Sequence, residues 1–206
     1  MKNIEAIIFD LGGVIFNINY KLTIESFEKI GIKNANMFYS KKEQKEIFDK
    51  LECGSVSKEM FINELLKFTT NKNKKTIEKS WNAMLLDLPL NRINYLKEIK
   101  KNHRIFLLSN TNIIHINKIK RDMGKNSWQK FNNLFEKVYL SYKIGVRKPS
   151  PESFHMILKE NNLTAHKVLF IDDSIQHIIA ARRIGIKAYH LQENEDIINL
   201  KIESIQ

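Results

Sequence analysis

The sequence contains little cysteine and proline and has no long apolar run. Cys53 is the one cysteine in 206 residues, so no disulfide can form within the chain, and no cluster of Cys and His has zinc-site spacing. No apolar run approaches the roughly 18 residues that a membrane span needs. The apolar N-terminal stretch contains Glu5 and Asp10, whereas a secretory signal keeps this stretch uncharged. These absences predict a protein of a reducing cytoplasm.

The charge balance is strongly basic. Lys plus Arg total 34 and Asp plus Glu total 23, which gives a net charge of +11. Such an excess is typical of proteins that neutralise nucleic-acid phosphates. Here, however, lysines stand beside glutamates in expected helices, as in KKEQKEIFDK, and this pattern is typical of solvated helix faces. We therefore expect no nucleic-acid partner. We also expect no membrane partner, and we expect the protein to be a monomer or a homodimer.

Short apolar runs alternate with amphipathic stretches along most of the chain. Five runs are expected to be strands: Ile4–Phe9, Arg104–Leu108, Lys137–Leu140, Lys167–Ile171 and Lys187–His190. The stretches between them are expected to be helices: Leu90–Lys101, Ile113–Met123, Pro151–Asn161 and Ile175–Ile184. This alternation predicts an α/β fold with a doubly wound parallel sheet.

One region interrupts that alternation with helical patterns alone. The expected helices are Leu22–Ile30, Lys41–Leu51, Lys58–Phe68 and Lys74–Leu85, with candidate N-caps at or near Thr23, Ser40 and Ser57. We therefore predict an α/β core of residues 1–17 and 87–206. Residues 18–86 are predicted to form an all-helical domain inserted after the first strand.

Polar groups follow four of the expected strands. Parallel strands present their carboxyl ends at one edge of a sheet, where ligands bind. This edge would gather three acids, a lysine, a hydroxyl and an amide: Asp10, Ser109, Asn110, Lys148, Asp172 and Asp173. Crowded carboxylates repel one another unless a cation lies between them, and oxygen ligands in a small site favour Mg²⁺. Gly12 and Gly13 would let backbone N–H groups approach an anion.

Each of these pieces has an ordinary structural explanation when taken alone. An aspartate after a strand is commonly a turn or cap residue, and Ser-Asn-Thr or Lys-Pro carries little information. Their combination, with each piece at a strand end, favours a phosphate site in which an aspartate attacks phosphorus.

Together these segments resemble the four motifs of the haloacid dehalogenase-like hydrolases. The first two are Asp10-Leu11-Gly12-Gly13-Val14 and Leu108-Ser109-Asn110-Thr111. The others are Arg147-Lys148-Pro149 and Ile171-Asp172-Asp173-Ser174. The helical insertion resembles that family's type 1 cap. Among its members, the sequence is similar to α-D-glucose-1-phosphate phosphatase and to the phosphatase domain of epoxide hydrolase.

The resemblance implies a role for each matching residue. Asp10 would be the nucleophile and a Mg²⁺ ligand, and Lys148 would bridge it to the phosphate. The phosphoryl group would be held by Ser109, Asn110, Lys148 and the Leu11–Gly12 backbone. The metal ligands would be Asp10, the Gly12 carbonyl and Asp173, with Asp172 acting directly or through water.

Gly12 departs from the family pattern. The family places a second aspartate here, two residues after the nucleophile, as the general acid and base. Losing such a group typically costs about 10²–10⁴ in rate. Three explanations stay open. The leaving group could be acidic, as an anomeric sugar oxygen is, or the enzyme could be slow. Alternatively, another residue near the site or in the cap could substitute, with His115, Asn17 and Asn19 as candidates, although Asn cannot itself act as a base.

Other candidate residues depend on the surrounding fold. His115 and His177 are expected to be partly exposed helix histidines, and Trp81 and Trp128 core residues. Cap residues that could face the substrate are Phe16, Asn17, Tyr20 and the segment Glu52-Cys53-Gly54, since a cap closes over such a site.

The leading hypothesis is a Mg²⁺-dependent phosphatase that hydrolyses a small phosphomonoester, such as a sugar phosphate, through an aspartyl-phosphate at Asp10. A 2-haloacid dehalogenase is one alternative, although that chemistry needs no metal and Asp172-Asp173 argues against it. A phosphomutase is disfavoured by Gly12. A non-catalytic protein that binds a phosphometabolite is the alternative that Gly12 favours.

Overall fold

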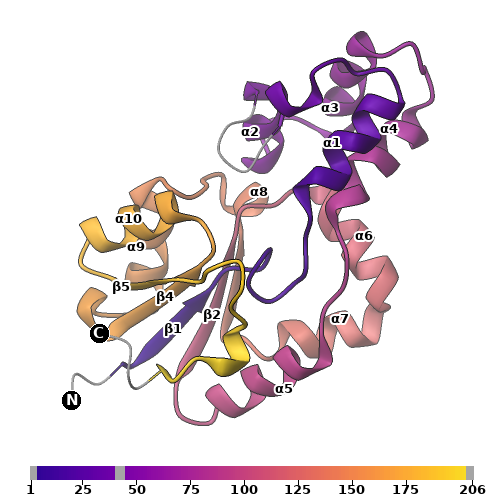
Figure 1. Cartoon of the computed structure of the whole chain (residues 1–206). Helices are drawn as coiled ribbons and strands as arrows, with labels where there is room; N and C mark the ends of the chain where they lie inside the picture. The colour runs from indigo at the N-terminus through magenta and orange to yellow at the C-terminus, as the bar shows by residue number, and fades with distance from the viewer. Residues whose placement is uncertain (1–3, 40–44, 203–206) are drawn as a thin grey trace.

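The computed structural model describes residues 4–39 and 45–202. Its centre is one sheet of five parallel strands in the order β3-β2-β1-β4-β5 (Figure 1). The strands are β1 (Ala6–Phe9), β2 (Arg104–Ser109), β3 (Lys137–Leu140), β4 (Val168–Asp172) and β5 (Lys187–His190). The register pairs Phe9 with Leu107 and with Ile171, so β1, β2 and β4 end within two residues of one another. The predicted α/β fold with a parallel sheet is confirmed.

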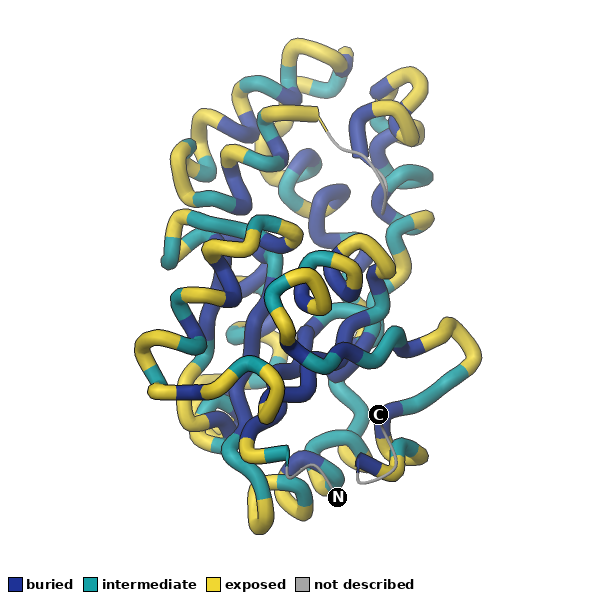
Figure 2. The backbone as a smooth tube through the Cα atoms, turned by 90° about the vertical axis from the view of Figure 1, so that its left-hand side faces the viewer, coloured by how far each residue is buried: buried dark blue, intermediate teal, exposed yellow. Residues whose placement is uncertain are grey.

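Helices cover both faces of the sheet. Ile7 and Phe9 of β1 point into one apolar layer, and Ala6 and Ile8 point into the other, as the period of two in a strand requires. The first layer is covered by α5 (Leu90–Ile99), α6 (Ile113–Met123) and α7 (Lys125–Asn132). The second is covered by α9 (Pro151–Glu160) and α10 (Ile175–Arg183). Figure 2 shows the buried strands between these partly exposed helices.

Residues 18–86, which we call the insert, contain helices and turns between β1 and α5. Its helices are α1 (Tyr20–Lys29), α2 (Glu46–Glu52), α3 (Lys58–Leu65) and α4 (Lys74–Trp81). They share an aromatic core in which the Trp81 ring lies 5.0 Å from Phe48 and 5.6 Å from Phe61. In Figure 1 the insert lies beyond the carboxyl ends of the strands, above α6. The helices of the insert thus share an apolar cluster, which Ile114 of α6 also joins.

Most predicted elements form within one or two residues of their expected ends. Lys137–Leu140, Lys187–His190 and Ile113–Met123 form as expected. Ser57 caps α3 by accepting a hydrogen bond from the Met60 N–H. The cap predicted at Thr23 is wrong, because Asn19 caps α1 and the Thr23 hydroxyl donates to the buried Trp81 carbonyl.

The helices of the insert are shorter than expected. The stretch predicted as one helix over 58–68 ends as α3 at Leu65 and continues as the 3₁₀ turn Leu66–Phe68. The stretch predicted over 74–85 likewise ends as α4 and continues as the 3₁₀ turn Asn82–Met84. The helix predicted from residue 41 begins as α2 at Glu46, and residues 40–44, including the candidate cap Ser40, lie outside the described residues.

Two helices were not predicted, α7 and the single turn α8 (Ser141–Ile144). Among the described residues, three further 3₁₀ turns are Ala35–Met37, Ala165–Lys167 and Ile197–Asn199.

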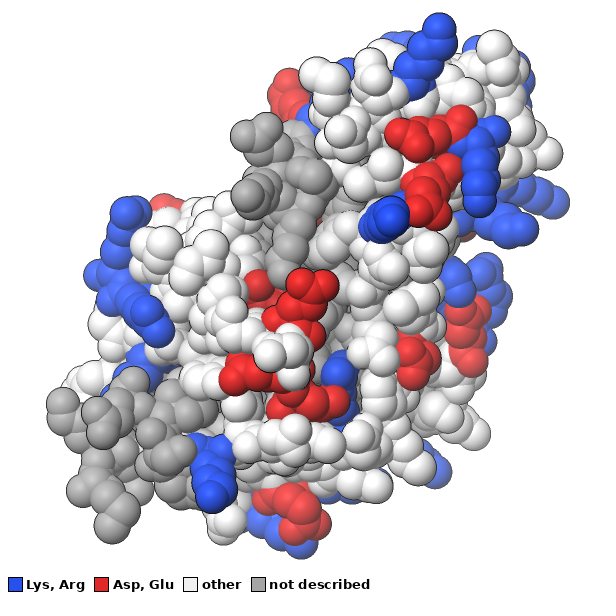
Figure 3. Space-filling view, in the orientation of Figure 1, with Lys and Arg blue, Asp and Glu red and all other residues white. Residues whose placement is uncertain are grey.

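No helix in the described ranges combines the length and the apolar character that crossing a bilayer requires. On the face shown in Figure 3, Lys and Arg side chains are spread over the insert and the molecular edges, with acidic side chains near the centre.

Candidate active site

The carboxyl edge of the sheet gathers the residues that the sequence places at strand ends. Asp10 follows β1, Ser109 ends β2, and Asp172 ends β4. Lys148 follows α8 in the segment after β3, and its side chain is fully buried. Residues separated by more than 100 positions are thereby brought into contact.

Lys148 joins two of the aspartates directly. Its Nζ donates to Asp10 Oδ1 at 2.7 Å and to Asp172 Oδ2 at 2.6 Å. Asp172 also accepts from the Ser174 N–H at 2.7 Å and lies 3.0 Å from His177 Nδ1. The carboxylate of Asp172 is therefore held by three partners, whereas Asp10 lies at the pocket surface and is 7% exposed.

These contacts separate the titration of the two carboxyls. Burial raises the pKa of Asp10 to about 7, opposed by Lys148 and reinforced by the charges of Asp172 and Asp173. Burial would also raise the pKa of Asp172, but Lys148 and His177 lower it below its ordinary value. Burial alone would lower the pKa of Lys148, and the two aspartates raise it instead. The site thus contains more negative charge than one lysine balances.

A divalent cation fits this surplus of negative charge. One carboxylate oxygen from each of Asp10, Asp172 and Asp173 lies within 4.8 Å of the others. Three carboxylates against the single Lys148 ammonium leave a net charge near −2, and hard oxygen ligands of this kind suit Mg²⁺. The charges of Asp172 and Asp173 add to the burial that raises the pKa of Asp10, and a bound cation would oppose both.

Asn110 positions the backbone of Lys148. Its Nδ2 donates to the Lys148 carbonyl, and its Oδ1 accepts from the Lys148 N–H, both at 2.8 Å. A similar pair of bonds joins the Ser141 hydroxyl to the backbone of Thr111, each at 2.9 Å. Ser109 Oγ makes only a long contact of 3.5 Å, to the Asn110 carbonyl. Hydrogen bonds to Asn110 and Ser141 thus tie the ends of β2 and β3 together.

The two glycines after Asp10 serve different purposes. Gly13 has φ +78°, and a Cβ built there would lie 2.4 Å from Asp173 Oδ2, so only glycine allows this carboxylate its position. Its N–H donates to the Phe16 carbonyl at 2.9 Å and closes a turn. At Gly12 a Cβ would lie 2.9 Å from Ile18 Cδ1. The space that the family's acid–base side chain would enter is therefore bordered by a hydrocarbon.

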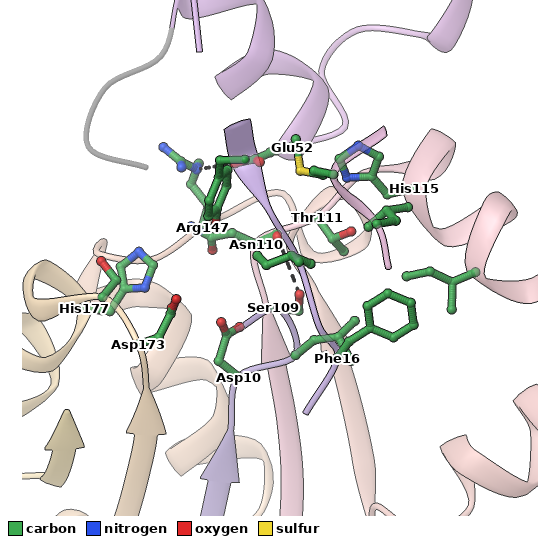
Figure 4. A pocket seen from close by; sticks show the side chains of 18 of the residues that line it. Asp10, Phe16, Glu52, Ser109, Asn110, Thr111, His115, Arg147, Asp173 and His177 are labelled. Atoms are coloured by element: carbon green, nitrogen blue, oxygen red, sulfur yellow. Dashed lines mark hydrogen bonds and ion pairs between the residues drawn. The ribbon is translucent and has the colours of Figure 1, made fainter. Parts of the chain in front are cut away.

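A pocket of about 90 Å³ extends from these residues to the insert (Figure 4). At the sheet end it is lined by Asp10, Leu11, Gly12, Ser109, Asn110 and Asp173. The insert end is lined by Tyr20, Tyr39, Glu52, Met84, Leu85 and Arg147. Of the residues predicted to face a substrate, Phe16, Tyr20 and Glu52 line this pocket, and Asn17, Cys53 and Gly54 do not.

Arg147 connects the core to the insert. Its Nη1 donates to Asp49 Oδ1 at 2.6 Å, and its Nε lies 2.9 Å from Glu52 Oε2. Both acids belong to α2, and the Glu52 side chain is only 6% exposed. No local pattern predicted a separate role for Arg147, because its acidic partners lie about 95 residues earlier in the chain. Tyr39 and Met84 also line the pocket and were not predicted, because their positions depend on how the insert packs.

Both histidines are buried, which contradicts their predicted partial exposure. His115 stacks on Trp81 at 4.5 Å, and its Nε2 lies 3.2 Å from the Trp81 carbonyl. Burial lowers its pKa to about 4, so it is neutral near pH 7. Burial also lowers the pKa of His177, against its bond to Asp172. The predicted core positions of Trp81 and Trp128 are confirmed.

The asparagines considered as substitutes for the missing acid–base lie elsewhere. Asn17 donates to Asp87 Oδ1 at 3.0 Å and accepts from Arg92 Nη1 at 2.9 Å. Asn19 caps α1. Both line an adjoining groove of the described structure rather than the pocket, whereas His115 does line the pocket.

Known proteins with similar sequences and folds include phosphatases and related hydrolases. The chain is 27% identical over 194 residues to a D-ribitol-5-phosphate phosphatase of Bacteroides thetaiotaomicron. The aligned residues cover 94% of each protein. A haloacid dehalogenase family enzyme of the same organism, solved with magnesium and inorganic phosphate, superposes with a TM-score of 0.83. It is 30% identical, over 95% of this chain and 98% of that one.

A haloacid dehalogenase-like hydrolase structure from Porphyromonas gingivalis superposes with a TM-score of 0.81, at 28% identity over 93% of each chain. The model of one family, described as haloacid dehalogenase-like hydrolase, matches residues 4–185. The predicted family and enzyme class are confirmed, and the magnesium in the solved relative agrees with the predicted cofactor. This chain belongs to the haloacid dehalogenase-like hydrolases.

Proposed function

We propose that this protein is a Mg²⁺-dependent phosphatase that hydrolyses a small sugar phosphate or a similar phosphomonoester through an aspartyl-phosphate at Asp10. The observation that carries the proposal is the cluster of Asp10, Lys148, Asp172 and Asp173 beside Ser109 at one sheet edge. The D-ribitol-5-phosphate phosphatase relative supports the substrate class.

In this proposal Asp10, Asp173 and the Gly12 carbonyl hold Mg²⁺, with Asp172 acting directly or through water. The bound ion would neutralise charge on the carboxylates and on the phosphoryl oxygens. Lys148 would also bind a phosphoryl oxygen, while its contact with Asp10 aims that carboxyl and opposes the rise in its pKa. The Ser109 hydroxyl and backbone N–H groups of Leu11 and Gly12 would hold the remaining oxygens.

The reaction has two displacements at phosphorus. A carboxylate oxygen of Asp10 attacks phosphorus, and the bond to the leaving alcohol oxygen breaks, which leaves an aspartyl-phosphate. Water then attacks the same phosphorus, releases inorganic phosphate and restores the Asp10 carboxylate. Asn110 contributes by fixing the backbone of Lys148. Residues 18–86 would act as a cap that excludes bulk water.

Gly12 provides no proton to the leaving oxygen. The reaction therefore depends on the acidity of the leaving group more strongly than in an enzyme with a carboxyl acid at this position. Esters of acidic alcohols, including anomeric sugar phosphates, are expected to react fastest.

Phosphate release from a panel of sugar phosphates, nucleotides and aryl phosphates, with and without Mg²⁺, tests the proposal. We expect Mg²⁺-dependent release that Asp10→Asn lowers by about 10⁴ or more, as for other nucleophiles. Asp87→Asn, at a residue outside the pocket lining, is the matched control and keeps the activity. Equal rates for wild type and Asp10→Asn would exclude the proposed nucleophile.

A further inference from the structure

The insert end of the pocket presents a donor and an acceptor side by side. The donor is the buried Nε–H of Arg147, which lies 2.9 Å from Glu52 Oε2 but is not aligned for a hydrogen bond with it. Within the described structure, no group accepts a hydrogen bond from this Nε. The acceptor is the carboxylate of Glu52, which has about four lone-pair positions. Figure 4 shows both groups opposite Asp10 and Ser109, at the far end of the pocket.

A hydroxyl group matches this pair, because it accepts one hydrogen bond and donates another. A buried N–H without a partner costs free energy. Because the Nε of Arg147 has almost no accessible surface, a ligand oxygen accepts from it only after the Glu52–Arg147 pair shifts on binding, and the unpaired N–H favours that shift. The same hydroxyl could donate to Glu52 in a charge-assisted bond, which is about twice as strong as a neutral one.

The charges at this end disfavour a second anion on the ligand. Arg147 is shared between Asp49 and Glu52, so the three side chains together have a net charge of −1. Among the described residues that line the pocket, Arg147 is the one Lys or Arg. Burial raises the pKa of Tyr20, and the acids at both ends of the pocket raise it further, so its phenol stays protonated. A carboxylate or second phosphate would therefore meet negative charge without a free cation to balance it.

We infer that Glu52 and Arg147 form a specificity-determining subsite for a hydroxyl group on the leaving alcohol. The pair selects small, uncharged phosphomonoesters that have such a hydroxyl over deoxy and anionic ones. This inference rests on the proposed phosphatase function, and it assigns the substrate class to residues on the insert end. The pocket volume of about 90 Å³ is small beside the roughly 300–1,000 Å³ typical of ligand pockets, which favours small leaving groups.

Three esters of equal carbon number separate the two parts of the inference. Glycerol 3-phosphate has neutral hydroxyls, propyl phosphate has none, and 3-phosphoglycerate has a carboxylate. We expect wild-type kcat/KM for glycerol 3-phosphate to exceed that for either other ester by at least about tenfold, since a site built for a hydroxyl rejects its deoxy analogue.

Glu52→Leu removes the acceptor and should lower the preference for glycerol 3-phosphate over propyl phosphate by about tenfold or more. Glu52→Gln keeps the shape and removes the charge, so it should raise the relative use of 3-phosphoglycerate severalfold. Glu46→Gln, on the same helix with an exposed side chain, is the control and should leave all ratios unchanged. If Glu52→Leu does not fold by circular dichroism, Arg147→Lys removes Nε and should produce the same loss of preference.

Two outcomes would overturn the inference. Unchanged substrate ratios in the folded Glu52 and Arg147 variants would show that the pair selects nothing. Turnover of aryl phosphates without turnover of glycerol 3-phosphate would remove the hydroxyl class while leaving the phosphatase function intact. If wild type released phosphate from no ester at all, the proposed function itself would fail.

Discussion

The sheet end and the insert end of the pocket are built in different ways. The sheet end is made of buried charges that follow parallel strands, and Lys148 links two of them at 2.6 and 2.7 Å. The insert end combines α2 and tyrosines with Arg147 from the core. Changes at the sheet end should therefore affect all substrates alike, whereas changes at the insert end should alter their ratios.

The largest effect is expected from Lys148→Met at the sheet end. This change leaves Asp10 and Asp172 as buried carboxylates without their shared ammonium. Breaking a buried ion pair typically costs about 3–5 kcal/mol in the free energy of unfolding. Denaturant unfolding measures that loss, and phosphate release should fall for every ester by the same factor. Lys143→Met, at an exposed lysine of α8, is the control, and a selective loss for one ester would contradict the comparison.

Gly13→Ala should weaken Mg²⁺ binding through Asp173. Gly13 and Gly145 both have φ +78°, so alanine at either position meets the same backbone strain. Only at position 13 would the new Cβ meet a carboxylate, since nothing lies within 4 Å at position 145. Calorimetry should show an affinity loss of about tenfold or more for Gly13→Ala, beyond any loss in Gly145→Ala. Equal affinities would show that Asp173 is not a metal ligand.

Restoring a carboxyl at position 12 should speed the reaction of poor leaving groups. Because Ile18 Cδ1 borders this position, we expect the double variant Gly12→Asp/Ile18→Ala to be needed. A positioned general acid contributes about 10²–10⁴, of which an unoptimised one should supply about tenfold. The rates of alkyl and aryl phosphates measure this, with Ile18→Ala as the control. A gain confined to aryl phosphates would contradict the assigned role.

The effect expected from pH is small near neutrality and grows as the solution becomes more acidic. Because the pKa of Asp10 is raised from 3.8 to about 7 in the metal-free protein, its folded form keeps a proton that the unfolded chain releases. The contribution of Asp10 to the free energy of unfolding therefore falls as pH rises from about 4 to 7. Mg²⁺ needs the ionised carboxylate, so its affinity should drop by up to about tenfold per pH unit below 7.

Thermal unfolding with and without Mg²⁺ at about pH 5.5 and pH 8 checks this pH effect. The stabilisation by Mg²⁺ should be larger at pH 8 in the wild type. In Asp10→Asn it should be smaller and should depend less on pH. An equal shift at both pH values in the wild type would show that Asp10 does not ligate the metal.

The difference between the two ends also explains how far the sequence could predict the site. Asp10, Ser109 and Asp172 each end or follow a buried strand, so a parallel sheet was enough to bring them together. The contact between Arg147 and Glu52 depends on how α2 packs against α8, which no local pattern encodes. The exposure of His115 and His177 was predicted wrongly for a similar reason. His115 lies on the face of α6 that contacts Trp81 of the insert, and His177 lies on the face of α10 beside Asp172.

The central claim is that Asp10 receives the phosphoryl group while the acids around it hold Mg²⁺. A crystal structure with Mg²⁺ and beryllofluoride, which mimics a phosphoryl group on a carboxylate, tests this claim most directly. We predict beryllium bonded to an Asp10 carboxylate oxygen, with Mg²⁺ bound to Asp10 and Asp173 and Lys148 contacting a fluoride. Beryllofluoride bound away from Asp10, or Mg²⁺ bound outside this cluster, would contradict it.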